Sequence, residues 1–275
     1  MTDTQDGIRT AVILCGGQGT RMGSLTEETA KSLLDVQGRP ILWYIITRLY
    51  LSGMRRFVLP VGYLGAQIAA YANQAFRLPG CEIICVDTGA DTPISHRINR
   101  VREHLPRDGS FLLTNGDALF DFDVTDMAVR HRDANAAITL ATVATISKYG
   151  LVIIKNGRIA GFERQSRVAA YMVEVGDKLN PGFVYTGTCM LHSRALEVIE
   201  LGASQRFEAE LFPKLIAEDT ALQYPLDGFW YSIDTPKDLA AVNTGVGADA
   251  IFAGPASALK ARLEADLMTA GRDRV

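Results

Sequence analysis

The residues best suited to chemistry begin with a glycine-rich loop, Gly16-Gly17-Gln18-Gly19-Thr20-Arg21, which follows the apolar run Thr10–Cys15. Such short residues let backbone N–H groups approach a polyphosphate, and Arg21 adds a guanidinium that can bind two phosphate oxygens. The loop lacks the third glycine of a dinucleotide GxGxxG and the Gly-Lys-Ser/Thr that closes a Walker A loop. A tight turn without a ligand would need only one or two of these glycines, so the loop indicates phosphate binding.

Three charged residues could complete such a site. Lys31 lies ten residues after Arg21 and borders an apolar stretch, although a lone lysine is more often solvated surface. Asp117 and Asp234 each follow an apolar run that reads as a strand. An aspartate at the tip of a buried strand can hold a divalent cation that bridges phosphates, but it can also serve a turn or cap a helix. Two such carboxylates in one crevice would suit a Mg²⁺-assisted phosphoryl-type transfer.

The elements that must position these residues alternate between strand and helix through the first half of the chain. Strands are predicted at Thr10–Cys15, Phe57–Val61, Glu82–Val86 and Phe111–Thr114. Helices are predicted at Ile41–Leu51, Leu64–Phe76, Ser95–His104 and Val124–Arg132, the last capped by Asp123. This alternation predicts an α/β fold with an open, mostly parallel, doubly wound sheet. Ligands bind beyond the carboxyl ends of such strands, so the glycine loop and Asp117 should face one crevice.

The second half changes to short β-type segments, and Asn156-Gly157 between apolar runs predicts a hairpin. We expect an antiparallel insertion that forms a lid or wall over the crevice. A late strand at Gly228–Ile233 leads to Asp234, and a terminal helix is predicted over about Ala256–Met268. We therefore divide the chain into a domain over 1–244, with a nucleotide half of about 9–135 and an acceptor half of about 136–244, and a helical tail over 245–275.

Composition excludes several classes of function. The net charge of -3 provides no global basic field for nucleic acid or an anionic membrane. No apolar run approaches the roughly 20 residues of a membrane helix, and the polar, acidic first seven residues are unlike a signal peptide. The four cysteines show no metal-type spacing with histidine. We therefore expect a cytoplasmic enzyme that binds phosphates at a local site.

Taken together, these segments resemble the sugar nucleotidyltransferase family, and most closely its glucose-1-phosphate cytidylyltransferase branch. The resemblance runs from about Arg9 to Val242. The stretch Ala11–Arg21 is similar to the family's nucleotide loop, and Gly38-Arg39-Pro40-Ile41-Leu42-Trp43 to the branch's Gly-Lys-Pro-Ile-Leu-Trp. The resemblance implies a Rossmann-like nucleotidyltransferase fold with an antiparallel, sugar-binding insertion, and a homo-oligomer. It also implies a nucleoside triphosphate and a phosphorylated small molecule as substrates, and Mg²⁺ as cofactor.

The resemblance also implies a role for individual residues. Nucleotide-binding residues would be Leu14, Gly16, Gly17, Gly19, Thr20, Arg21, Arg97 and Gly116. Residues around the sugar and its phosphate would be Tyr149, Gly150, Glu163, Arg164, Asn180 and Gly182. Catalysis would rest on Arg21, Lys31 and Asp117, and Mg²⁺ would be held by Asp117 and Asp234.

The sequence departs from the family at the places that would choose the substrates. Ile94-Ser95-His96-Arg97 stands where the branch has Thr-Gly-Gly-Arg, and Arg164-Gln165 stands where the family has Lys-Pro. Ala30 replaces the proline before Lys31. The resemblance favours CTP and a sugar 1-phosphate as the substrates. The departures leave another base (dTTP, GTP or UTP) or an unusual or non-sugar phosphate or phosphonate acceptor as alternatives. A catalytically inactive nucleotide-sensing subunit and a dinucleotide-dependent oxidoreductase are the remaining alternatives.

Overall fold

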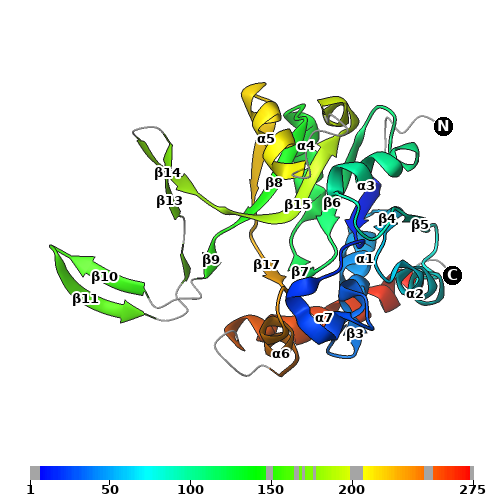
Figure 1. Cartoon of the computed structure of the whole chain (residues 1–275), viewed down its shortest axis with the longest axis horizontal. Coiled ribbons are helices and arrows are strands. Elements are labelled where there is room, and N and C mark those ends of the chain that lie inside the picture. Colours follow the sequence, from blue (N-terminus) through cyan, green and yellow to red (C-terminus); the bar gives the residue numbers. More distant parts are fainter. Residues whose placement is uncertain are drawn as a thin grey trace.

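A seven-stranded sheet runs through the centre of the molecule in the computed structural model, which describes residues 7–146, 151–163, 167–168, 171–175, 178–198, 207–244 and 250–272 (Figure 1). The strand order is β16-β8-β15-β6-β1-β4-β5. The strands are β1 (Thr10–Leu14), β4 (Arg56–Val61), β5 (Glu82–Asp87), β6 (Ser110–Asn115), β8 (Ile138–Val143), β15 (Val184–His192) and β16 (Ala221–Pro225). Only the pairs that include β15 are antiparallel, which confirms the predicted mostly parallel α/β sheet.

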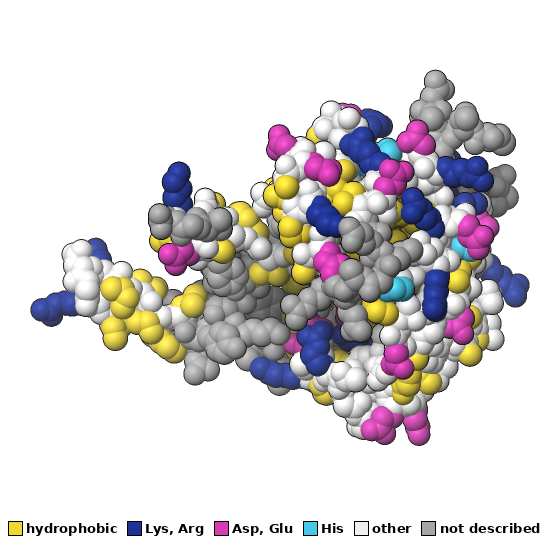
Figure 2. All heavy atoms as spheres, turned by 45° about the horizontal axis from the view of Figure 1, so that its top comes forward, with side chains coloured by type: hydrophobic (Ala, Val, Ile, Leu, Met, Phe, Trp, Pro, Cys, Tyr) yellow, Lys and Arg dark blue, Asp and Glu magenta, His cyan; other side chains and the backbone are white. Residues whose placement is uncertain are grey.

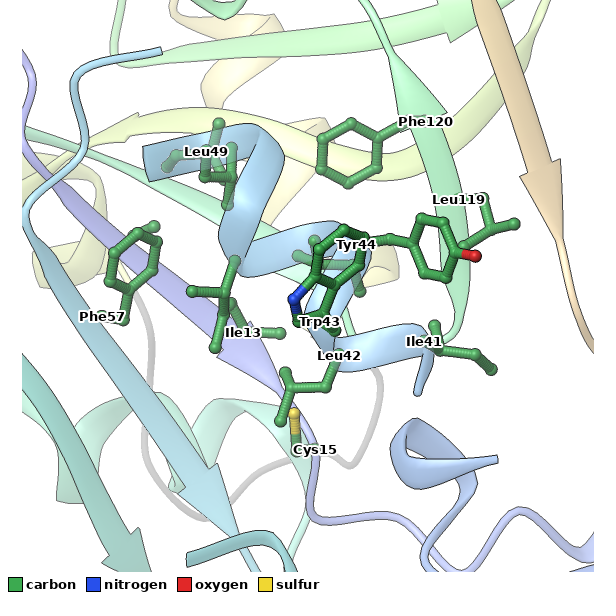
Figure 3. Packing of buried hydrophobic residues seen from close by; sticks show 14 of the residues in the cluster. Ile13, Cys15, Ile41, Leu42, Trp43, Tyr44, Leu49, Phe57, Leu119 and Phe120 are labelled. Atoms are coloured by element: carbon green, nitrogen blue, oxygen red, sulfur yellow. The ribbon is translucent and has the colours of Figure 1, made fainter. Parts of the chain in front are cut away.

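The helices cover both faces of this sheet. They are α1 (Ile41–Leu51), α2 (Gly65–Ala75), α3 (Ile94–Arg100), α4 (Val124–Asp133), α5 (Phe207–Ala217), α6 (Pro236–Thr244) and α7 (Ala250–Arg272). Helix α1 is apolar on nearly every side because it is buried between the sheet and other elements. Figure 3 shows its residues Trp43 and Tyr44 among side chains from β1, β4 and β7 (Ala118–Asp121). No helix among the described residues is both long and apolar enough to cross a membrane.

The C-terminal helix α7 packs against α1 and α6 of the body. Its residues Leu259 and Leu263 are buried, and Glu264 pairs with Arg39 at 3.0 Å. The tail is therefore an integral part of the fold, and it covers the side of α1 that faces away from the sheet.

Two hairpins project from the body as an arm (Figure 1). They are β10 (Leu151–Lys155) with β11 (Arg158–Glu163), and β13 (Tyr171–Val175) with β14 (Lys178–Gly182). Asn156 and Gly157 both have positive φ, so the predicted turn is confirmed. Figure 2 shows apolar side chains along the arm, and Ile159 is 74% exposed. The described parts of these hairpins extend away from the central sheet (Figure 1), and the role of the insertion as a lid or wall over the crevice stays a prediction.

Candidate active site

The glycine-rich loop leaves the carboxyl end of β1 and enters a short 3₁₀ segment, Thr20–Thr26. Gly19 has a φ of 65°, and a Cβ there would lie 3.1 Å from the side chain of Lys31. Only glycine adopts this conformation at low cost, and it also allows the close approach. The loop, Lys31 and Asp117 line a cavity of about 250 Å³. The structure thus brings together the phosphate-binding residues that the sequence predicted.

A two-stranded ribbon brings the two predicted metal ligands side by side. Strand β7 pairs with β17 (Phe229–Ser232) in antiparallel register, with Ala118 opposite Ser232. The N–H of Ile233 donates to the carbonyl of Asp117 at 2.9 Å. Asp117 and Asp234 are far apart in sequence, and this pairing places both at the same end of the ribbon.

Lys31 lies between the two carboxylates. Its Nζ donates to Asp117 Oδ2 at 2.7 Å and to Asp234 Oδ1 at 3.1 Å, and its side chain is only 12% exposed. Arg21 Nη2 lies 2.8 Å from the same oxygen of Asp234, with its own side chain 70% exposed. Two carboxylates are thus balanced by two cations, Lys31 held inside the site and Arg21 largely exposed at its rim.

The surroundings of Asp234 shift the pKa of its carboxylate. Burial raises its pKa, but the Ser232 hydroxyl, Lys31 and Arg21 outweigh this effect, so its pKa lies below the ordinary value. The backbone N–H groups of Asp234 and Thr235 donate to Asp238 Oδ2 at 3.1 and 2.8 Å. Asp238 therefore fixes the backbone from which Asp234 projects. This buried aspartate was not predicted from the sequence, although Thr235-x-x-Asp238 fits the capping-box pattern that begins α6.

The donor set of the site fits a divalent cation. One oxygen of Asp117 and one of Asp234 converge on the same ammonium nitrogen, so both already face a common positive charge. Among the described residues, no group of three or more His, Cys, Asp or Glu could enclose a metal. Mg²⁺ sites commonly take one or two carboxylates and complete their shell with water and substrate phosphates, so two carboxylates suffice.

A second cavity of about 480 Å³ adjoins the first and shares Leu14, Gly17, Gly116 and Asp117 with it. Its far side is formed by the segment 90–94, which links β5 to α3. Gln18 Nε2 donates to Asp91 Oδ1 at 2.7 Å across these two segments. The two cavities together provide adjacent space for phosphates and for a nucleoside.

Arg97, a predicted nucleotide-binding residue, lies in the wall of this second cavity but is only 4% exposed. Its guanidinium donates to protein oxygens, among them the carbonyl of Gly16 at 2.9 Å. In this structure Arg97 therefore supports the loop from behind, and direct contact with a nucleotide stays a prediction.

The predicted acceptor residues that the structure describes lie on the hairpins of the arm. Tyr149, Gly150 and Arg164 lie outside the described residues, and only the backbone of Glu163 is described, at the end of β11. Asn180 and Gly182 lie on β14, in the projecting arm. The side chain of Asn180 is exposed and donates to the carbonyl of Lys178. Their roles toward an acceptor stay predictions.

Comparison with known proteins gives the same class as the site. Residues 10–248 match the nucleotidyl transferase family. The chain is 28% identical over 252 residues to a Bacillus subtilis protein named probable glucose-1-phosphate cytidylyltransferase, which covers 85% of this chain and 94% of that protein. It is 28% identical over 233 residues to mannose-1-phosphate guanyltransferase beta-B of Xenopus laevis, which covers 83% of this chain and 62% of that longer protein. The structure is similar in fold to a UDP-glucose pyrophosphorylase from Acinetobacter baumannii, with a TM-score of 0.62 at 17% identity over 84% of this chain and 90% of the other.

The chain therefore belongs to the nucleotidyl transferase family, and within it to the sugar-1-phosphate nucleotidyltransferases. The similarity to the cytidylyltransferase branch that the sequence suggested is confirmed. The protein is an enzyme of this class, so the non-catalytic and oxidoreductase alternatives are not supported.

Proposed function

We propose that the enzyme transfers a cytidylyl group from CTP to a sugar 1-phosphate in a Mg²⁺-dependent reaction that releases pyrophosphate. The observation that carries this proposal is the convergence of Lys31, Asp117 and Asp234 beside the glycine loop, with Arg21 at its exposed rim. A triphosphate on the loop would meet all four groups. Relatives named for glucose-1-phosphate cytidylyltransferase activity support CTP and a sugar 1-phosphate as the substrates.

The reaction needs no side-chain nucleophile, because the acceptor's phosphate dianion can itself attack the α-phosphorus. A bond forms between an acceptor oxygen and the α-phosphorus as the bond from that phosphorus to the β-phosphate oxygen breaks, and the electron pair leaves with pyrophosphate. Asp117 and Asp234 would hold Mg²⁺, which supplies positive charge to the phosphates when bound. Lys31 and Arg21 would position the triphosphate and neutralise charge that develops on it.

The choice of base is proposed from the second cavity. Asp91 lines this cavity, and a carboxylate can accept a hydrogen bond from the N4 amino group of cytosine. Uracil and thymine carry a carbonyl oxygen at that position, which a carboxylate repels. GTP is the second candidate, since guanine also carries amino hydrogens and a guanyltransferase is among the relatives.

Turnover with a substrate panel tests this function. The purified enzyme would be incubated with each of CTP, GTP, UTP, dTTP and ATP, and with a series of sugar 1-phosphates, phosphates and phosphonates. Pyrophosphate release would be measured with Mg²⁺ and with excess chelator. The proposal expects release with CTP and a sugar 1-phosphate that the chelator abolishes. Release only with another base would refute CTP as the substrate, and full activity in excess chelator would refute the requirement for Mg²⁺.

We also propose that the enzyme works as a homo-oligomer, with the apolar side chains of the arm contributing to the contact between copies. The support is their exposure, which is 74% at Ile159 and 65% at Leu179. Size-exclusion chromatography coupled to light scattering would measure the molecular mass, and a monomer at micromolar concentration would refute the proposal.

A further inference from the structure

We propose that Arg97 sets the affinity for the triphosphate from beneath the glycine loop, as a positioning residue that acts through Gly16 and Gly17. The inference rests on the proposed function, in which this loop binds the triphosphate. It differs from the direct nucleotide contact that family resemblance implies for Arg97, because here the arginine acts on the triphosphate through the backbone of the loop.

The guanidinium of Arg97 joins three segments at the carboxyl ends of neighbouring parallel strands. Its Nη2 donates to the carbonyls of Gly16 at 2.9 Å and Ala90 at 2.8 Å. Its Nη1 donates to Thr88 Oγ1 at 2.6 Å and to the carbonyl of Val61 at 3.3 Å. These acceptors lie at or just beyond the carboxyl ends of β1, β4 and β5, so one buried side chain fixes the segments that surround the nucleoside cavity.

The backbone passes directly over this guanidinium. A Cβ on Gly16 would lie 2.0 Å from Nη1 of Arg97, and a Cβ on Gly62 would lie 2.7 Å from the same atom. Gly16 does not have a positive φ, so its backbone conformation alone does not require glycine. The requirement for glycine at this position comes from the arginine beneath it.

The contact with Arg97 also orients the loop. In a trans peptide, the carbonyl of one residue and the N–H of the next point in opposite directions. Because the Gly16 carbonyl bonds inward to Arg97, the N–H of Gly17 points outward. No described residue accepts a hydrogen bond from this N–H, and Gly17 lines both cavities. Arg97, together with the N–H of Tyr63, which donates to the same carbonyl at 3.2 Å, thus turns a carbonyl away from the phosphates and a donor toward them.

In the part of the chain that the structure describes, no carboxylate forms an ion pair with Arg97, although the nearby carboxylates of Asp87 and Asp91 favour its charged form. Its four acceptors are three carbonyls and a hydroxyl, which satisfy its hydrogen bonds but leave its net charge in place. Asp91, which could approach it, accepts instead from Gln18. A buried charge is screened little by solvent, so it favours a polyanion bound on the other side of the loop.

Nucleotide affinity tests the proposal without any need for turnover. Dissociation constants for CTP and GTP would be measured by calorimetry for the wild type, Arg97→Met, Arg97→Lys and the control Arg100→Met. Arg100 lies one turn along α3 and donates to Thr88 and Thr92, but not to Gly16. We expect triphosphate affinity to fall about 100-fold in Arg97→Met, since both the charge and the hydrogen bonds are lost. We expect the affinity to fall about tenfold in Arg97→Lys, which keeps the charge but loses the planar guanidinium, and less than about twofold in the control.

Two further measurements separate positioning from general damage to the fold. In the variants that turn over, KM for the triphosphate should rise while KM for the sugar phosphate stays within about threefold. In Arg97→Ala, added guanidinium at millimolar concentration should restore part of the triphosphate affinity by filling the vacated site. If Arg97→Met does not fold, Arg97→Lys and the guanidinium rescue decide the question.

Several outcomes would overturn the proposal. They are a folded Arg97→Met variant with wild-type triphosphate affinity, an equal rise of both KM values, and an equal loss in Arg100→Met. Failure of this proposal can also be distinguished from failure of the proposed function. A protein whose triphosphate affinity depends on Arg97 but which forms no sugar nucleotide would refute the function and leave this inference standing.

Discussion

Replacement of Lys31 by methionine removes the ammonium that Asp117 and Asp234 share, and it keeps the length of the side chain. The distances of 2.7 and 3.1 Å and the 12% exposure of Lys31 place the two pairs between an exposed salt bridge and a fully buried one. Exposed pairs contribute up to about 1 kcal/mol, and breaking a buried pair costs about 3 kcal/mol or more. We therefore expect Lys31→Met to lower the free energy of unfolding by about 2 kcal/mol at neutral pH.

For a chain of this size, that loss corresponds to a decrease in Tm of about 6 °C. The pKa of Asp234 lies below its ordinary 3.8 in the folded protein, so its stabilisation is complete above that value and is lost as pH falls through the folded-state pKa. The difference in Tm between wild type and variant should therefore be constant from about pH 8 to about pH 5 and shrink at more acid pH.

Thermal melts followed by circular dichroism would measure both quantities, with Lys155→Met as the matched control. Lys155 is exposed on the arm, and its replacement should shift Tm by less than about 1 °C. In the same variants, kcat/KM should fall about 100-fold for Lys31→Met because a preorganised cation is lost, and remain unchanged for the control. A folded Lys31→Met enzyme with wild-type Tm and wild-type kcat/KM would refute the role assigned to Lys31.

Three other predictions concern the metal ligand, the loop and a buried histidine. Asp117→Asn should lower kcat at least about 100-fold and weaken Mn²⁺ binding measured by electron paramagnetic resonance, and near-normal turnover would remove Asp117 from the metal site. Gly16→Ala should abolish triphosphate binding, because its Cβ would meet Arg97, whereas Gly17→Ala should retain the loop, because a Cβ there has nothing within 4 Å. Equal calorimetric affinities in the two variants would contradict this. Burial and, less strongly, His192 and Arg194 lower the pKa of His131 to about 4, so the neutral ring stabilises the fold above pH 6.5 and this stabilisation is lost as pH falls toward 4. His131→Asn should flatten the dependence of Tm on pH in that range, and an unchanged slope would show that His131 is not its source.

The elements with local signals were predicted well from the sequence. Helix α1 was predicted with its observed bounds, because Pro40 marks its start and nine of its eleven residues are aliphatic or aromatic. The N-cap at Asp123 is also confirmed, since its side chain accepts from the N–H groups of Thr125 and Asp126. These features depend on residues close in sequence, so the pattern alone is sufficient.

Two strands that depend on distant partners were missed. Strand β7 was not predicted, because Ala118–Asp121 is stabilised by pairing with Phe229–Ser232 rather than by its own pattern. Strand β16 was missed for a similar reason, since it ends at Pro225 and lies at the edge of the sheet.

The site shows the same division between local and long-range information. The loop, Lys31, Asp117 and Asp234 could be predicted because each carries a recognisable residue type after a strand or beside an apolar run. The position of Arg97 could not, because its acceptors follow three different strands and are mostly backbone carbonyls, which leave no trace in the sequence. Asp238 matches the capping-box pattern, but the pattern does not show that its carboxylate also accepts a hydrogen bond from the N–H of Asp234.

The central claim is that a triphosphate on the glycine loop is cleaved between its α- and β-phosphates by the phosphate of an acceptor. Phosphorus-31 NMR of a reaction with CTP, a sugar 1-phosphate and Mg²⁺ tests it most directly. The account predicts that two mutually coupled doublets of a nucleoside diphosphate sugar appear together with an equal amount of pyrophosphate. Formation of CDP with transfer of the γ-phosphate, or release of CMP without a coupled product, would contradict it.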